Sequence, residues 1–328
     1  MTNLISALLL SVSLSWSAEW PPLDARLSGY DYPHPVQLHA LSWQGHRVEL
    51  AYMDIPPTGD PSGEVILLLH GKNFSGAYWA EAISKLTAEG HRVVVPDQVG
   101  FGRSSKPDDV QYSFHAMVKH TTSLLDALGV GRVSVVGHSM GGMVAARFAL
   151  DRPARTDKLV LINPIGLEDW RRLTPYRSVD AWVARNQKAT PEGIQKYMRD
   201  AYFDGQWSEA YDPLVAIQAG WAIGPDKDTI ARVSALHYDM IFTQPVVYEL
   251  PDIQAPTLLI IGERDRTALN RDLVDEVTRA TLGRYEVLGE KAAAAIPDAE
   301  LVELPGIGHV PQVEAPGPTY DALLRFLR

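Results

Sequence analysis

The sequence contains no cysteine, which excludes both a disulfide framework and a thiol nucleophile. It has no block of consecutive lysines and arginines, and its formal net charge is −10. Nucleic acids and anionic membrane surfaces attract proteins of the opposite charge, so we expect no partner of either kind. The sequence also has no ligand spacing typical of a zinc site, and we expect neither a metal nor a cofactor.

The N-terminal segment is apolar but too short to span a bilayer. Residues 4–16 are apolar with interspersed serines, and small residues follow before Glu19. This pattern is typical of a secretory signal peptide, so we expect residues 1–18 to be cleaved after Ser17 or Ala18. The mature protein would then be periplasmic or secreted, without stable insertion into a membrane. A disordered or membrane-associated tail is the alternative interpretation.

Apolar segments typical of strands alternate with helical segments along most of the chain. The expected strands are residues 38–43, 46–53, 65–69, 92–96, 133–136, 158–163, 257–262 and 299–304. The expected helices are residues 79–89, 114–128, 144–150, 270–282, 284–297 and 319–327. Continuous apolar runs are typical of strands buried on both faces. The alternation therefore predicts an α/β fold with a mostly parallel central sheet and helices on both faces.

Two segments differ in composition from this pattern. Residues 19–36 are rich in proline and tyrosine, and we expect them to form an extended leader on the fold. Residues 166–251 are rich in tryptophan and tyrosine and contain no buried strand pattern. We expect this second segment to be a helical cap over the carboxyl edge of the sheet. The core of the fold would then comprise residues 37–165 and 252–328.

Some aromatic residues of the expected cap pack it against the core, and others line a pocket. No rule of sequence separates the two sets. We select Trp170, His237 and Phe242 as the candidate substrate-binding residues.

A Gly-x-Ser-x-Gly pattern, Gly137 to Gly141, lies between an expected strand and an expected helix. A serine on such a sharp turn has strained backbone angles, and neighbours two residues away must lack a Cβ to avoid a clash. Ser139 would also sit at the N-terminus of the helix, where free N–H groups favour a developing negative charge. The pattern predicts that Ser139 is a nucleophile, whereas a glycine-rich turn with a surface serine is the alternative.

Four further motifs follow the ends of other expected strands. The five motifs in chain order are His70-Gly71, Asp97-x-x-Gly100-x-Gly102-x-Ser104, Gly137-His138-Ser139-Met140-Gly141-Gly142, Gly262-Glu263-Arg264-Asp265 and Gly308-His309. Together they resemble the α/β-hydrolase fold family, in its lid-bearing serine hydrolase and esterase branch. The resemblance extends from about residue 38 to the C-terminus, although it covers the lid only as a type of insertion.

This resemblance implies a catalytic triad in the chain order Ser, Asp, His. Ser139 would be the nucleophile and His309 the base that takes its proton. Asp265 would orient the imidazole and stabilise its cation. Glu263 and Asp272 are the alternatives to Asp265.

The resemblance also implies an oxyanion hole made of backbone N–H groups. Met140, directly after the nucleophile, and Lys72, directly after His70-Gly71, would supply them. Asn73 is the alternative donor, and the Lys72 side chain is expected to be solvated on its loop.

The same resemblance argues against some related chemistries. Dehalogenases and epoxide hydrolases of this fold need a carboxylate in place of Ser139, and carbon–carbon bond hydrolases typically carry asparagine in place of His138. We therefore expect a hydrolase that cleaves small or medium acyl esters through an acyl-enzyme, with a small-molecule ester as its substrate. A lactonase, peptidase, acyltransferase or carbon–carbon bond hydrolase on the same triad remains an alternative. A ligand-binding or receptor protein is the alternative of another class, and the oligomeric state is open.

Overall fold

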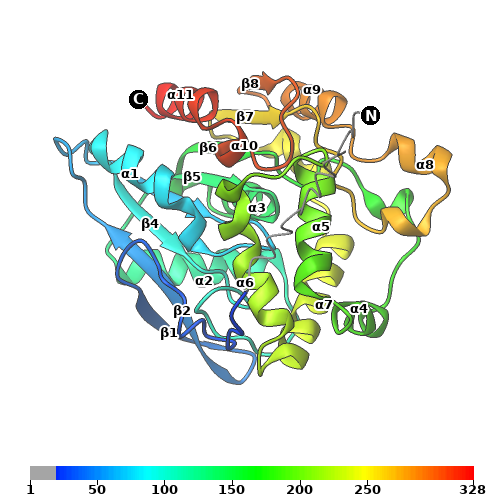
Figure 1. Ribbon diagram of the computed structural model, residues 1–328. Coiled ribbons are helices and arrows are strands. Elements are labelled where there is room, and N and C mark those ends of the chain that lie inside the picture. Colours follow the sequence, from blue (N-terminus) through cyan, green and yellow to red (C-terminus); the bar gives the residue numbers. More distant parts are fainter. Residues whose placement is uncertain (1–19) are drawn as a thin grey trace, which may run out of the picture.

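One eight-stranded sheet forms the centre of the computed structural model, which describes residues 20–328 (Figure 1). The strands are β1 (Gln37–Trp43), β2 (His46–Ile55), β3 (Val65–Leu69), β4 (Arg92–Pro96), β5 (Val133–His138), β6 (Thr156–Ile162), β7 (Thr257–Gly262) and β8 (Ala299–Leu304). Their order is β1-β2-β4-β3-β5-β6-β7-β8. Strand β2 pairs antiparallel with β1 and β4, and the other pairs are parallel. The expected signal peptide, residues 1–18, lies outside the described residues.

Helices cover both faces of this sheet, as the alternating pattern predicts. The helices of the core are α1 (Ala80–Ala88), α2 (Phe114–Ala127), α3 (Met140–Asp151), α8 (Glu276–Thr281), α9 (Tyr285–Ala295), α10 (Pro311–Glu314) and α11 (Pro316–Leu327). Short 3₁₀ segments are η1 (Gly76–Trp79), η2 (Pro153–Arg155), η3 (Trp170–Arg172), η4 (Glu209–Tyr211), η5 (Val247–Asp252) and η6 (Arg271–Leu273). No helix in the described part of the chain is both long enough and apolar enough to cross a membrane.

The continuous apolar runs are explained by the two packed faces of the sheet. In β3, Ile66 and Leu68 pack with α1 and α11, whereas Leu67 and Leu69 pack with α2, α3 and α9. Successive side chains of a strand point to opposite faces, so a strand covered on both sides needs an apolar residue at every position.

The sequence patterns place most element boundaries within a few residues, but residues 270–282 do not form one helix. Asn270 has a left-handed backbone, with φ of 57°, and is followed only by the short η6. Helix α8 starts after Asp275, whose carboxylate accepts the Thr278 N–H at 2.7 Å. Helix α11 begins at Pro316, three residues earlier than expected, because proline is well suited to the first turn of a helix.

Residues 166–251, which we call the cap segment, connect β6 to β7 through four helices. These are α4 (Val179–Asn186), α5 (Pro191–Tyr202), α6 (Asp212–Ala222) and α7 (Lys227–Thr243). In Figure 1 they lie together on the lower right of the sheet, with α4 packed on α7 and α5 on α6. Met198 and Tyr202 of α5 share an apolar cluster with Phe74 and Val310 of the core, which ties the segment to loops at the sheet edge.

The residues of the expected leader contact the cap segment. The side chains of Leu23 and Leu27 pack with Ile217 and Trp221 of α6. The Leu23 N–H donates to the Gly220 carbonyl at 3.0 Å. The leader therefore packs on a helix of the cap segment as well as on the core.

The turn after β5 allows a first prediction, on stability. A Cβ at Gly137 would lie 2.2 Å from the Gly141 carbonyl oxygen, whereas a Cβ at Gly131 would meet nothing within 4 Å. Gly137→Ala should lower the free energy of unfolding by about 1–3 kcal/mol through overpacking. Gly131→Ala should leave it unchanged or raise it by less than about 1 kcal/mol. Urea denaturation of both variants measures the difference, and equal stabilities would contradict the tight turn.

Candidate active site

Ser139 occupies a strained turn between β5 and α3, as the Gly-x-Ser-x-Gly pattern predicts. Its backbone has φ of 56° and ψ of −121°, a region that residues with a Cβ rarely adopt. A Cβ at Gly141 would lie 2.1 Å from the Leu69 carbonyl oxygen, and Gly137 is similarly crowded. Both glycines are therefore needed for the close approach of strand, turn and helix.

The structure brings Ser139, His309 and Asp265 together in one hydrogen-bonded chain. His309 Nε2 lies 2.9 Å from Ser139 Oγ, and His309 Nδ1 lies 2.5 Å from Asp265 Oδ2. A carboxylate only accepts, so Nδ1–H donates to Asp265 and Nε2 is left to accept the serine proton. All three side chains are buried, with Ser139 at 6% exposure and Asp265 at 0%.

Asn163 and Thr267 hold the Asp265 carboxylate in this position. Asn163 Nδ2 donates to Asp265 Oδ2 at 3.0 Å, and the Thr267 N–H donates to Oδ1 at 2.8 Å. Burial alone would raise the pKa of Asp265, but the charge and hydrogen bond of His309 and the bonds from Thr267 outweigh it, and the pKa lies below its usual value. Asn163 directly follows β6, so its position at a strand end is the sequence signal that could have identified it.

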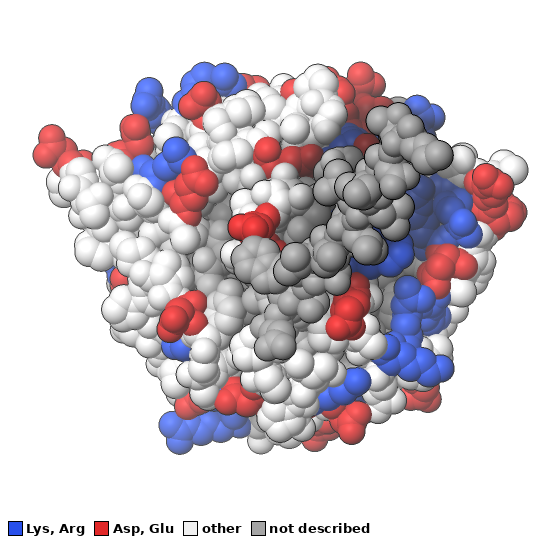
Figure 2. All heavy atoms as spheres, in the orientation of Figure 1, with Lys and Arg blue, Asp and Glu red and all other residues white. Residues whose placement is uncertain are grey.

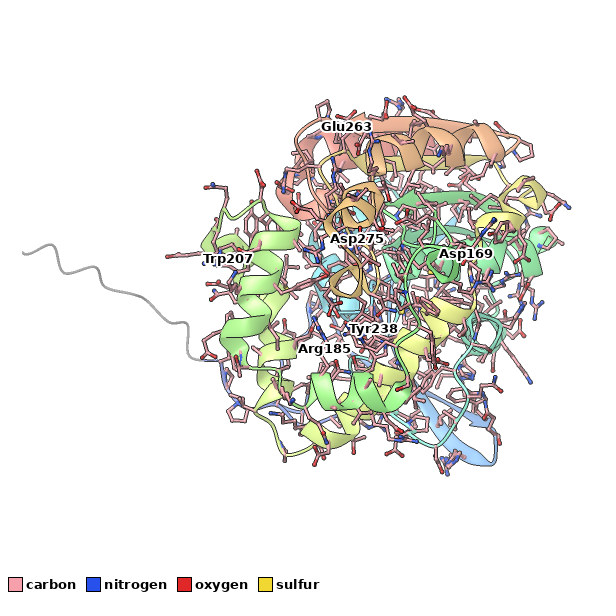
Figure 3. All side chains as sticks on the ribbon, turned by 90° about the vertical axis from the view of Figure 1, so that its right-hand side faces the viewer. Asp169, Arg185, Trp207, Tyr238, Glu263 and Asp275 are labelled. Carbon is pink, nitrogen blue, oxygen red and sulfur yellow. The ribbon has the colours of Figure 1, made fainter. Side chains whose placement is uncertain are left out.

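The two alternative acids do not reach the imidazole. Asp272 binds Arg177 at 2.6 Å and Arg185 at 2.8 Å at the edge of the cap segment. Glu263 lies at the upper edge of the molecule in Figure 3, and it forms no hydrogen bond or ion pair with His309, whose carboxylate partner is Asp265. Of the three predicted carboxylates, only Asp265 contacts His309.

His138 links the nucleophile turn to the loop that carries His309, a role that the sequence did not reveal. Its Nε2–H donates to the His309 carbonyl at 2.8 Å, and its Nδ1 accepts the Tyr78 hydroxyl at 3.0 Å. The Tyr78 hydroxyl in turn accepts the Gly71 N–H at 3.3 Å. Burial and the neighbouring His309 lower the pKa of His138 to about 3, so it stays neutral in this network.

The backbone N–H groups expected in the oxyanion hole are free to bind a ligand. Neither the Lys72 nor the Met140 N–H has an acceptor among the described residues, and the Asn73 N–H has none either, so it stays the alternative donor. His70 fixes this loop, because its Nδ1–H donates to the Gly71 carbonyl at 2.8 Å and its Nε2 accepts the Gln98 N–H at 2.9 Å. Met140 begins α3, whose N-terminus favours negative charge.

Two adjoining cavities lie beneath the cap segment. Their open volumes, mouths included, are about 670 Å³ and about 1330 Å³. Residues common to both walls are Asn73, Asn186, Ala189, Ile194, Gln218 and Tyr238. Ser139 lines neither, but Asn73 Nδ2 donates to the Tyr202 hydroxyl at 3.2 Å and the Tyr202 ring lies 4.6 Å from the His309 ring. Tyr202 therefore contacts both Asn73, a residue of the cavity walls, and the imidazole of His309.

The structure places the three candidate substrate-binding residues elsewhere. His237 is fully buried between the rings of Phe101 and Tyr112, at 4.3 Å and 4.1 Å. Trp170 and Phe242 also belong to the main apolar core, and none of the three lines either cavity. They anchor the cap segment to the core, which a large aromatic surface does well. The aromatic residues that line the cavities are instead Phe101, Trp182, Tyr197, Trp221 and Tyr238.

This site can form and resolve a covalent adduct. It combines a hydroxyl with a base, an acid that orients the base and free N–H donors. Among residues 20–328, no group of three or more His, Asp or Glu side chains could hold a metal ion. A serine on a strand–turn–helix elbow, with its acid and histidine on later loops, defines the class of α/β-hydrolases.

Comparison with known protein families agrees with this class. Residues 64–316 match the family described as alpha/beta hydrolase fold, and the chain belongs to this family. It is 32% identical over 268 residues to a Pseudomonas syringae pv. syringae protein named "Putative carbamate hydrolase RutD", covering 80% of this chain and 93% of the relative.

Solved structures show the same similarity. The crystal structure of a probable hydrolytic enzyme from Pseudomonas aeruginosa PAO1 has a TM-score of 0.92 and 48% identity, covering 94% of this chain and 99% of that one. A thermophilic esterase from Thermogutta terrifontis has a TM-score of 0.66 and 25% identity, covering 89% of this chain and 98% of that one. These similarities support hydrolase activity for the chain. They do not identify the type of bond that it cleaves.

The strained turn yields a prediction that does not depend on activity. Ser139→Gly removes the Cβ that is unfavourable at φ of 56°, whereas Ser139→Ala keeps it, and both remove the hydroxyl. The glycine variant should be more stable than the alanine variant by about 1–2 kcal/mol. Thermal unfolding of the pair tests this. An alanine variant as stable as the glycine variant would show that the turn carries no strain.

Proposed function

We propose that this α/β-hydrolase is a carboxylesterase that cleaves small or medium acyl esters through an acyl-enzyme. Ser139 is the nucleophile, His309 the general base and acid, and Asp265 the residue that orients the base and stabilises its protonated form. The observation that carries the proposal is the unbroken hydrogen-bonded chain from Asp265 Oδ2 through the imidazole to Ser139 Oγ. A protein that only binds a ligand needs none of these contacts.

Acylation begins when His309 Nε2 takes the proton of Ser139 as Oγ bonds to the ester carbonyl carbon. The carbonyl oxygen becomes an oxyanion, which the N–H groups of Met140 and Lys72 are free to bind. The carbon–oxygen bond to the alcohol then breaks, and the alcohol leaves with the proton from His309. Water attacks the acyl-enzyme by the reverse proton transfers, which releases the acid and restores Ser139.

The buried carboxylate supports the charge that forms on His309 in each half-reaction. Asp265 has a pKa below its usual value, so it is ionised at neutral pH. Asn163 and Thr267 bind the two carboxylate oxygens and hold them toward Nδ1. The attraction between this carboxylate and the imidazolium is strong because both groups are shielded from water.

A carbamate is the second candidate, because a relative that is 32% identical carries that activity in its name. The same attack on a carbonyl carbon applies, but the leaving group is bound through nitrogen. A panel of p-nitrophenyl esters of increasing chain length, run beside carbamates, lactones and aminoacyl amides, separates the candidates. The fastest class identifies the scissile bond, and slow single turnover with a retained adduct on every class would favour a receptor.

Loss of the nucleophile should abolish the reaction. Ser139→Ala should show no turnover of p-nitrophenyl acetate and no covalent labelling by a fluorophosphonate probe, because no other hydroxyl contacts His309 Nε2 in the described residues. Ser123→Ala is the matched control, because Ser123 Oγ also binds a histidine, His39 Nε2 at 2.9 Å, but that histidine is not part of the triad. A Ser139→Ala protein labelled at the wild-type rate would refute the assignment.

Loss of the acid should slow the chemical step. Asp265→Asn should lower kcat by about 10⁴-fold with a small change in KM, since the amide cannot hold the required tautomer of His309. Glu263→Gln is the control for the alternative acid and should keep wild-type kinetics, because Glu263 does not contact the imidazole. Steady-state kinetics on the preferred p-nitrophenyl ester measure both. If Glu263→Gln were the slower variant, the assignment of the acid would be wrong.

A further inference from the structure

The sequence led us to expect a Lys72 side chain that is solvated on its loop, but in the structure this residue is half-buried. It extends beneath α7, where Nζ donates to Ser234 Oγ at 2.8 Å and lies 3.5 Å from the centre of the Tyr238 ring. Lys72 lines the smaller cavity together with Ser234 and Tyr238. Because Nζ donates to Ser234 Oγ, the Ser234 hydroxyl keeps its own proton for a ligand in this cavity.

The Lys72 ammonium has no counter-ion in the described part of the chain. Lys72 forms no ion pair with an Asp or Glu there, and the charged side chains in the wall of the smaller cavity are Lys72 and Lys227. A charge without a partner is costly to bury, and here desolvation lowers the pKa of Lys72 to about 7. An anionic group in the cavity would supply the missing partner.

The larger cavity is also lined by positive charge. Four of its wall residues are cationic, namely Arg185, Lys188, Arg266 and Arg271, and Asp272 is the acidic one. Asp272 is paired with Arg185 and Arg177, and Arg266 is paired with Glu286 at 3.0 Å. Lys188 and Arg271 are the cationic wall residues without a carboxylate partner among the described residues. In Figure 2, Lys and Arg gather on the right-hand side of the face where Figure 1 labels α4, α5 and α8. Figure 3 shows Arg185 of α4 next to Tyr238 of α7, a residue of both cavity walls.

This distribution departs from the charge of the whole chain. With a formal net charge of −10, the chain as a whole repels anions, and cations concentrated along a concave surface reverse that effect locally. The two walls share the uncharged residues Asn73 and Tyr238, so the cavity that contains Lys72 adjoins the one with the cationic wall residues.

We infer that the cavity beside Lys72 binds a carboxylate of the substrate, so that the enzyme acts on small esters that carry a second, ionised acid group. A monoester of a dicarboxylic acid is the simplest member of this class. The inference rests on the proposed ester hydrolysis and adds the charge of the substrate to it. Lys72 would bind the carboxylate through Nζ, with Ser234 as a second donor, while the ester carbonyl lies at Ser139.

The binding should depend on pH because the ammonium form of Lys72 attracts the anion. Affinity for the carboxylate is then full below the pKa of Lys72, about 7, and falls as the pH rises through it. The titratable neighbours on α7 do not obscure this. Burial lowers the pKa of His237 to about 3 and raises that of Tyr238, and Lys227 adds a second positive charge to the wall.

Kinetics on matched esters test the inference. Monomethyl adipate and methyl hexanoate have acyl chains of equal length and differ in one carboxylate, and a pH-stat follows both. Lys72→Met keeps the backbone N–H, and it should lower the preference for the charged ester over the neutral one by at least about tenfold. Lys72→Arg should retain most of the preference. Lys119 is an exposed lysine of α2, and Lys119→Met should keep both wild-type rates.

The preference of the wild-type enzyme for the charged ester should fall between about pH 6 and about pH 8.5, through the titration of Lys72.

A binding measurement separates this inference from the proposed function. In the Ser139→Ala protein, which has no nucleophile, calorimetry should detect adipate at about pH 6 and a weaker affinity at about pH 8.5. The double variant Lys72→Met, Ser139→Ala should bind adipate at least about tenfold more weakly, with the uncharged methyl hexanoate as the control for apolar binding. Adipate binding together with a wild-type enzyme that turns over no ester would contradict the proposed function but would support the anion site.

Three results would overturn the inference. The first is a wild-type enzyme with no preference for monomethyl adipate over methyl hexanoate. The second is a Lys72→Met variant that loses both activities equally, which would assign Lys72 to the reaction or to folding. Thermal unfolding of the variant separates these two causes. The third is adipate binding that does not depend on Lys72.

Discussion

The hydroxyl of Ser139 can reach a base only because the chain reverses sharply between β5 and α3. Two contacts set the space available: the Gly141 carbonyl oxygen approaches the Cα of Gly137, and the Leu69 carbonyl oxygen approaches that of Gly141. Side chains at these positions would push the helix away from the sheet. Ser139 would then leave the edge where the loops after β3, β7 and β8 meet. In the sheet, β3 lies on one side of β5, and β7 and β8 lie beyond β6 on the other side, so their loops flank the turn after β5. The turn and the topology therefore depend on each other.

Hydrogen bonds between loops fix what the turn alone cannot. His138 is the last residue of β5, and its side chain binds the backbone carbonyl of His309. His309 is the proposed base for Ser139, the residue directly after His138. Asn163, after β6, binds both Asp265 and the backbone of Gly262. Each loop of the site is therefore attached to a strand other than its own. Such cross-links hold the imidazole within reach of both partners without help from substrate.

The sequence predicts the sheet, the elbow and the three residues of the triad, because each leaves a local signal. Buried strands are apolar at every position, and a Gly-x-Ser-x-Gly between a strand and a helix has few other physical explanations. The roles of His138 and Asn163 cannot be predicted in this way, because a single polar residue at a strand end does not indicate its partner. The partner of His138 is 171 residues away in the sequence, and that of Asn163 is 102 residues away. The cap segment is the hardest part. Trp170, His237 and Phe242 are aromatic, and so are Trp182, Tyr197 and Tyr238. Only the packing of the helices decides which of the two sets faces the cavities.

The two roles that we propose for Lys72 come from different parts of the same residue. Its N–H belongs to the loop after β3 and is free to bind the oxyanion, while its Nζ lies under α7 at the cavity wall. If the cavity takes a carboxylate, the ion pair forms on the loop that supplies the oxyanion donor. Binding energy from a remote group would then position the donor that acts in the transition state, which raises the rate as well as the affinity. A neutral ester of equal length fills the same space but lacks this contact, so the charge of the substrate would decide how well the loop is placed.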